Sequence, residues 1–281
     1  MGQLGGALAL VALGLTFPLA AVHAAQIAPH VVFIDHTTRS GTLHLANNGT
    51  TPEEVTIAVK FGYPDTDSVG NVYVRLIDSP DSAQPSAAGW IHVFPTRMIL
   101  KPGAFQTVRL LAEPPAGLPD GEYWTRLVST ARGRRTVVSG ADSSAGKSLP
   151  SASLAVETRT IIPVLYRKGA VRTGVGVGRF RAAVQEDSIV ARVRLRRQGN
   201  AAYLGTTIFR LVGGSGQEVR KWELPVAIYY QLDRRYTFPL NSLAPGRYVL
   251  HLDVTTARTD VNQINILPAS PVADSTTLEV P

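Results

Sequence analysis

The chain has 281 residues, of which 44% are hydrophobic and 17% charged, so it is long enough for about two domains with packed cores. It contains no cysteine, which excludes a disulfide framework and a thiolate metal site. Its formal net charge of +7 permits an anionic partner such as nucleic acid, anionic lipid or an acidic polymer.

The N-terminal segment has the pattern of a secretory signal. Residues 4–22 form an apolar run, and small residues around Ala24 stand where a signal peptidase would cut, although no Lys or Arg precedes the run. The alternative is an uncleaved membrane anchor, against which Pro18 and three glycines argue. We therefore predict a signal peptide over residues 1–24, and export argues against nucleic acid as the partner.

The first half of the mature chain is a series of short alternating runs with turn residues between them. Asn47-Asn48-Gly49 and Lys101-Pro102-Gly103 suit tight reversals, and no amphipathic helix of ordinary length interrupts the series. This spacing predicts an immunoglobulin-like Greek-key β-sandwich. The predicted strands are 27–34, 42–46, 55–61, 72–77, 90–94, 105–111, 123–129 and 154–167.

The last of these strands, 154–167, changes character along its length. One face is apolar or threonine throughout, whereas the other carries Ala155, Glu157 and Arg159 and is apolar from Ile161, so the second half should lie deeper. Pro163 has no N–H for a ladder, which places the strand at a sheet edge or a bulge. An edge with an apolar row is open to a partner strand. The glycine-rich segment 133–150 before it is predicted to be a flexible loop.

The second half repeats the pattern, with predicted strands at 189–195, 204–212, 222–226, 235–238, 248–254 and 276–280. Gly174-Val-Gly-Val-Gly178 lacks the spacing of a phosphate loop and is interpreted as an inter-domain turn or a strand. Tyr123 and Tyr248 each stand two residues after a turn glycine, which is the position of the tyrosine corner in immunoglobulin-like sandwiches. The prediction is an all-β chain of two tandem sandwiches, at 25–168 and 169–281.

Catalytic patterns are not found. The six histidines show neither His-Glu-x-x-His nor a paired metal-ligand spacing, and no serine lies in Gly-x-Ser-x-Gly, so we predict no enzyme and no cofactor. Arg192, Arg194 and Arg196 share one face of a predicted strand. They form either a solvated outer face or a docking surface for an anionic partner.

Several motifs resemble the two-domain periplasmic chaperones of the chaperone–usher pilus pathway. The resemblance covers about residues 26–168. It rests on Pro-Gly-x-x-Gln-x-Val-Arg at 102–109, on Leu118-Pro119 ahead of Glu122, and on the long strand that closes at Tyr166-Arg167. The resemblance implies a periplasmic protein that binds a pilin-like subunit by lending it an edge strand, and that passes it to an outer-membrane usher.

The resemblance also implies site residues. Matching Arg167 to the arginine that ends the family's lent strand places the lent side chains at Leu154, Val156 and Thr158, with Ala152 as a further position. Glu122 and Arg167 match two members of the family's ion network between the domains. The third member is an acid in the second domain, for which Asp253 and Asp260 are candidates.

The chain departs from the family at the two basic residues that hold the subunit's terminal carboxylate. Those positions are His30 and Pro163 here. A protonated His30 can hold a carboxylate, so client binding would weaken as the imidazole loses its proton, whereas Pro163 cannot hold one. The alternative is that His30 fills or borders the core.

Two hypotheses follow from the sequence. The first is a non-enzymatic chaperone for a pilin-like subunit, without cofactor, nucleic acid or small-molecule substrate. The second is an exported adhesion or binding module that uses the arginine face to hold anionic surfaces or glycans.

Overall fold

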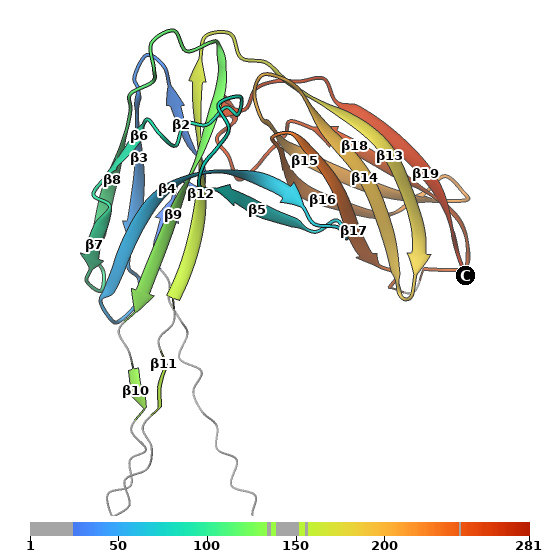
Figure 1. The fold of residues 1–281 in the computed structure, drawn as a ribbon. Coiled ribbons are helices and arrows are strands. Elements are labelled where there is room, and N and C mark those ends of the chain that lie inside the picture. The colour runs from blue at the N-terminus through green and yellow to red at the C-terminus, as the bar shows by residue number, and fades with distance from the viewer. Residues whose placement is uncertain (1–24, 134–135, 139–151, 155–156, 242) are drawn as a thin grey trace, which may run out of the picture.

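The computed structural model describes residues 25–281, apart from 134–135, 139–151, 155–156 and 242, and gives only the backbone of 136–138 and 152–154. The chain forms two β-sandwich bodies that meet at an angle (Figure 1). This confirms the predicted fold class. The predicted signal peptide, most of the predicted loop 133–150 and Val156 lie outside the described residues.

The first sandwich packs two sheets face to face. One sheet has the order β1-β3-β8-β6 and the other β2-β12-β9-β4-β5, with β7 pairing with β4. Buried aliphatic side chains from both sheets meet in one core. The strands are β1 (Gln26–Ala28), β2 (Val32–Asp35), β3 (Ser40–Ala46), β4 (Glu53–Thr66), β5 (Val72–Ile77), β6 (Ile91–Phe94), β7 (Arg97–Leu100), β8 (Phe105–Ala112), β9 (Gly121–Gly133) and β12 (Glu157–Lys168). A separate two-stranded ladder joins β10 (Thr136–Val138) and β11 (Ala152–Leu154).

The predicted strand 27–34 is wrong as a single element. The structure divides it into β1 and β2, which belong to different sheets, and Pro29 lies between them after a cis peptide bond. A proline cannot donate to a ladder, so it suits the point where the chain leaves one sheet for the other. The strand β7 was not predicted, because Met98, Ile99 and Leu100 are consecutive apolar residues and show no alternation.

The second sandwich also has two sheets, with the orders β13-β14-β17 and β16-β15-β18-β19. Gly174–Gly178 lies within β13 and is therefore part of a strand. The strands are β13 (Thr173–Gln185), β14 (Ser188–Gly199), β15 (Tyr203–Gly213), β16 (Glu218–Ile228), β17 (Gln231–Pro239), β18 (Gly246–Thr255) and β19 (Val272–Val280). A 3-10 turn, η1 (Gln263–Asn265), precedes β19. Within the described part of the chain, no helix has the length and apolar character needed to cross a membrane.

Both predicted tyrosine corners are confirmed. The hydroxyl of Tyr123 donates to the carbonyl oxygen of Pro119 at 2.9 Å, and that of Tyr248 donates to the carbonyl oxygen of Ala244 at 2.8 Å. Each bond spans four residues and ties the start of a strand to the turn before it. The two sandwiches therefore use the same device at equivalent corners.

The two halves of β12 differ as the sequence predicts. Val164–Arg167 pairs with β9 on one side and with β2, in parallel, on the other, and the side chains of Val164, Leu165 and Tyr166 are buried. Residues 157–163 pair with β9 alone among the described strands, and Glu157 and Arg159 are exposed. Pro163 thus stands where an edge becomes an interior strand.

The corner of the second sandwich gives a test of the fold. Tyr248→Phe removes the hydrogen bond that ties this strand to the carbonyl oxygen of Ala244, so the free energy of unfolding should fall by about 0.5–1.5 kcal/mol. Chemical denaturation measures this loss. Tyr73→Phe is the matched control, because that side chain is exposed, and it should change stability by less than about 0.5 kcal/mol. Equal losses in the two variants would contradict the role given to the corner.

Candidate partner-binding site

A buried aromatic cluster joins the two sandwiches. Phe61, Trp124 and Leu165 of the first sandwich pack against residues of the second that include Tyr229. The rings of Trp124 and Tyr229 lie edge to face, with centroids 4.7 Å apart, and neither side chain is more than 1% exposed. The outer face of the sheet β2-β12-β9-β4-β5 therefore carries the second sandwich at one end. Residues 157–163 of β12 lie toward the other end.

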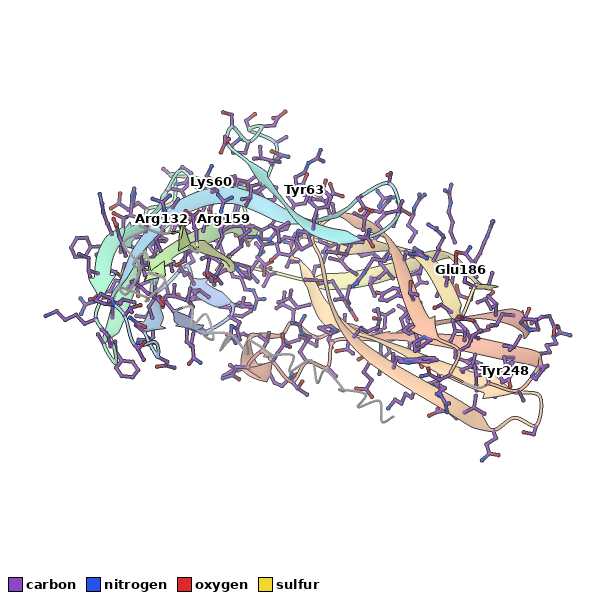
Figure 2. All side chains as sticks on the ribbon, turned by 90° about the horizontal axis from the view of Figure 1, so that it is seen from below. Lys60, Tyr63, Arg132, Arg159, Glu186 and Tyr248 are labelled. Carbon is purple, nitrogen blue, oxygen red and sulfur yellow. The ribbon has the colours of Figure 1, made fainter. Side chains whose placement is uncertain are left out.

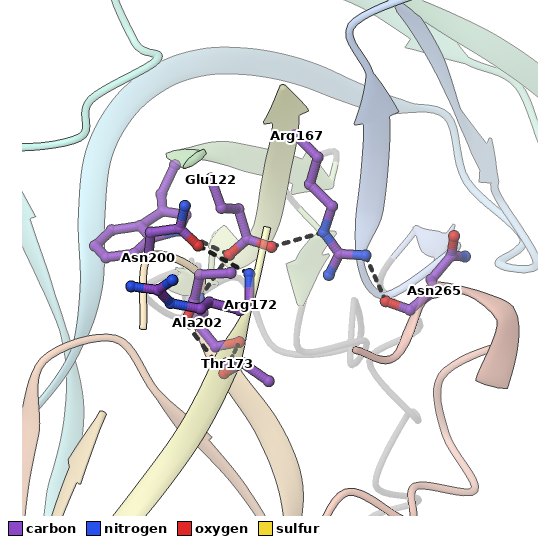
Figure 3. A network of polar contacts seen from close by, with 9 residues as sticks. Glu122, Arg167, Arg172, Thr173, Asn200, Ala202 and Asn265 are labelled. Carbon is purple, nitrogen blue, oxygen red and sulfur yellow. Dashed lines mark hydrogen bonds and ion pairs between the residues drawn. The ribbon is translucent and has the colours of Figure 1, made fainter. Parts of the chain in front are cut away.

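A polar network crosses the same junction (Figure 3). Nε of Arg167 donates to Oε2 of Glu122 at 2.8 Å, where the Glu122 side chain is fully buried and that of Arg167 is 16% exposed. Oε1 of Glu122 accepts from Nε1 of Trp124 and from the backbone N–H of Ala202, each at 2.9 Å. The two residues taken from the sequence as an ion pair therefore lie together, and the second sandwich supplies a third donor.

The second-domain acid expected in this network is replaced by a carbonyl group. Nη1 of Arg167 donates to the backbone oxygen of Asn265 at 2.7 Å. Of the two candidates, Asp253 pairs with Arg210, and Asp260 pairs with Arg258. The assignment of either aspartate to this network is thus wrong. A carbonyl oxygen offers no residue type that a sequence search could detect.

The linker between the sandwiches is held by side chains that the sequence analysis missed. Oδ1 of Asn200 accepts from the backbone N–H of Arg172 at 2.9 Å, and its Nδ2 donates to the carbonyl oxygen of Ala170 at 3.0 Å. The carboxylate of Asp120 accepts from the N–H of Ala170, and this bond lowers the pKa of Asp120 below its usual value. In the sequence, the role of Asn200 in holding the linker is indicated only by the position of an Asn close to a turn.

The predicted donor residues lie on the free part of the long strand and on the ladder beyond it. Thr158 is half-buried on β12 and pairs with Ala131 of β9. Ala152 and Leu154 lie in β11, whose backbone pairs with β10, and their side chains are not described. Val156 lies outside the described residues. Residues 157–163 of β12, which pair with β9 alone among the described strands, thus directly follow the other predicted donors in the chain.

His30 lies at the junction and does not fill the core. Its side chain is exposed and lines a cavity of about 380 Å³ between the β1–β2 corner and the loop before η1, so the core interpretation is wrong. The same cavity is lined by Asp260, Asn262 and Asn265 of the second sandwich. Asp260 has a lowered pKa, first because Arg258 binds its carboxylate and to a lesser degree because His30 lies near.

A buried base that the sequence analysis missed lies beside Pro163. Arg126 of β9 is in register with Pro163 and is 4% exposed. Its Nε donates to the carbonyl oxygen of Gly62 at 2.9 Å, and its guanidinium lies over the ring of Tyr229, 4.7 Å from the centroid. Pro163 therefore has a basic residue, Arg126, beside it on the neighbouring strand. The second sandwich covers this arginine.

The arginine face of β14 is the outer face of a sheet. Arg192 and Arg196 are exposed and alternate with buried Ala191, Val193 and Leu195. Arg194 makes a two-pronged contact with Asp233, with Nε 2.6 Å from Oδ1, and Arg192 donates to the carbonyl oxygen of Val69 at 3.3 Å. Two of the three arginines, Arg192 and Arg194, therefore already bind other groups of this chain. No group of His, Cys, Asp and Glu that could hold a metal ion occurs among the described residues.

Comparisons with known proteins found no matching family model and no matching curated protein. Among solved structures, the chain resembles one from the CsuC–CsuE chaperone–tip adhesion subunit pre-assembly complex of the archaic chaperone–usher Csu pili of Acinetobacter baumannii. This match has 12% identity and a TM-score of 0.44, and it covers 91% of this chain and 98% of that one.

Two further matches concern the same class of protein. The YadV chaperone is 14% identical, with a TM-score of 0.42 and coverage of 90% of this chain and 99% of that one. A chain from the Salmonella enterica SafA pilin–SafB chaperone complex is 13% identical, with a TM-score of 0.39 and coverage of 90% and 96%. Each of these three neighbours is a chaperone or comes from a complex that contains one.

The Glu122–Arg167 pair gives the second prediction. Glu122→Gln removes the counter-charge of a largely buried guanidinium, so the free energy of unfolding should fall by about 3–5 kcal/mol. Glu54→Gln is the control, since Glu54 pairs with Arg97 on the surface, and it should cost at most about 1 kcal/mol. Denaturant titration of both variants measures the difference. Similar losses would show that the buried pair is not essential to the junction.

Proposed function

We propose that this protein is a periplasmic, non-enzymatic chaperone that binds a pilin-like subunit by lending it an edge strand and delivers it to an outer-membrane usher. In this proposal, residues 1–24 are removed on export, 25–168 form the chaperone domain and 169–281 form the second domain. The observation that carries the proposal is β12, which is anchored between two strands from Val164 onward and before that pairs with β9 alone among the described strands. A free edge is what strand addition requires.

The predicted donor side chains continue a face whose other end is already core. Ile162, Val164 and Tyr166 are buried in the first sandwich, and Thr158, Val156 and Leu154 follow at the same two-residue period. A client strand added to this edge would therefore extend the sandwich, with the client's own groove receiving Leu154 and Val156. The anchored half of β12 fixes the register of the free half, because a slip of one residue would exchange the two faces.

The energetics require backbone pairing as well as side chains. Burying Leu154 and Val156 would contribute roughly 1.5–3 kcal/mol each. Association costs about 4–15 kcal/mol, so these side chains alone would not hold a client. Each ladder hydrogen bond adds about 0.5–1.5 kcal/mol. A strand that offers a row of free backbone groups is thus better suited to this task than an isolated apolar patch.

In this proposal, His30 makes a second contact with the client. It is exposed in a cavity at the junction, and Arg258 already neutralises the nearby carboxylate of Asp260. A protonated imidazole there would donate to a client carboxylate, as the resemblance implies. Pro163 provides no such contact, so the anchor in this chain would rest on His30 alone.

Co-purification tests the proposal. Tagged mature protein should leave the periplasm with a β-rich subunit at one-to-one stoichiometry. Replacing Leu154 and Val156 together by glutamate should abolish this, because two carboxylates would have to enter apolar pockets. The thermal unfolding of the variant should stay unchanged.

Arg159→Glu is the matched control, since Arg159 is exposed on the opposite face of the same strand. This variant should retain the subunit. The proposal fails if both proteins lose it, or if neither does.

A further inference from the structure

A long hairpin of the first sandwich reaches the second. The strand β4 begins with Val55 and Ile57 in the core of the first sandwich, passes through Phe61 in the junction, and ends at Thr66. Lys60 and Tyr63 mark its course from one body to the other (Figure 2). The hairpin returns through β5, so its tip, residues 66–71, lies well outside its own sandwich.

The tip contacts β17 and β14 through hydrogen bonds. The backbone N–H of Arg235 donates to the carbonyl oxygen of Gly70 at 2.9 Å, and that of Asp233 donates to Oγ1 of Thr66 at 3.1 Å. Arg192 of β14 donates to the carbonyl oxygen of Val69 at 3.3 Å. Two of the three donors are backbone groups of one strand.

These donors belong to the edge of a sheet. In the order β13-β14-β17, the strand β17 pairs with β14 on one side, and its other side faces the hairpin. Unpaired N–H groups on such an edge would be available to another chain. The hairpin tip accepts from two of them, at Asp233 and Arg235, and so covers this part of the edge.

Hydrogen bonds within the hairpin tip hold it in the conformation that makes this contact. The carboxylate of Asp67 accepts from the backbone N–H groups of Gly70 and Asn71, each at 2.8 Å, which closes the turn. Gly70 has a φ of +96°, and a Cβ there would lie 2.8 Å from the backbone nitrogen of Arg235. A side chain at this position would therefore force the tip away from β17.

We propose that the β4–β5 hairpin is a clamp that covers the edge of β17 and sets the angle between the two sandwiches. The junction at Glu122 and the linker form one attachment, about which the second sandwich could rotate. The hairpin tip forms another attachment on a different strand, and two separate attachments resist that rotation. This role does not depend on whether the chain binds a client.

Distance measurements between spin labels test the clamp. The chain has no cysteine, so Thr107→Cys on β8 and Thr277→Cys on β19 give one exposed label in each sandwich. The parent protein should show one narrow distance distribution, and Gly70→Val should broaden or shift it. Gly103→Val is the matched control, because Gly103 also has a positive φ, of +70°, but has no neighbour within 4 Å of a Cβ. It should leave the distribution unchanged.

A second variant avoids backbone strain in case Gly70→Val does not fold. Thr66→Ala with Arg192→Ala removes two of the three contacts and leaves the turn intact. Hydrogen exchange of the Asp233 and Arg235 amides should accelerate at least about tenfold in this variant, because the clamp opens locally. Unchanged exchange at both amides, or a parent-like distance distribution in a folded Gly70→Val, would overturn the proposal.

Discussion

The junction depends on one buried carboxylate. Glu122 has no exposed side-chain surface, so its charge is stable only where donors replace the water it has lost. It receives Arg167 from the end of β12, Trp124 from its own strand and the backbone N–H of Ala202, which directly precedes β15. These donors come from both sandwiches, so a shift of either one would leave a buried charge short of partners. The carboxylate therefore fixes the elements around it.

This constraint explains why β12 can have two different halves. Its C-terminal half is fixed by β2 on one side and by β9 on the other, and the ion pair of Arg167 with Glu122 of β9 adds to the second contact. The N-terminal half, for which β9 is the one partner among the described strands, can then keep its direction and its register. Pro163, which has no N–H to offer, stands at the last residue before β2 begins to pair. A residue that looks like a defect in a strand thus lies where the strand changes from edge to interior.

The sequence predicts the features that residue types encode. Alternation predicted most strands and the two tandem sandwiches, and a turn glycine followed by Tyr predicted the corners at Tyr123 and Tyr248. The pairing of Glu122 with Arg167 came from the family resemblance. The sequence could not predict contacts made by backbone groups, such as the carbonyl oxygen of Asn265 that takes the place of an acid. It also missed the split at Pro29 and left His30 open between a binding position and the core, because both depend on how the chain crosses from one sheet to the other.

The junction combines two kinds of interaction that do different work. The aromatic cluster around Trp124 and Tyr229 removes apolar surface from water, but burial of this kind has no preferred direction. Hydrogen bonds do have one, and several of those across the junction end on backbone groups of the second sandwich, at Ala202, Asn265 and Arg235. Backbone groups cannot change rotamer, so these bonds form only when the second sandwich itself is in the right position. The aromatic contact thus holds the two bodies together, while their relative orientation depends on a few polar contacts spread over both sides of the junction.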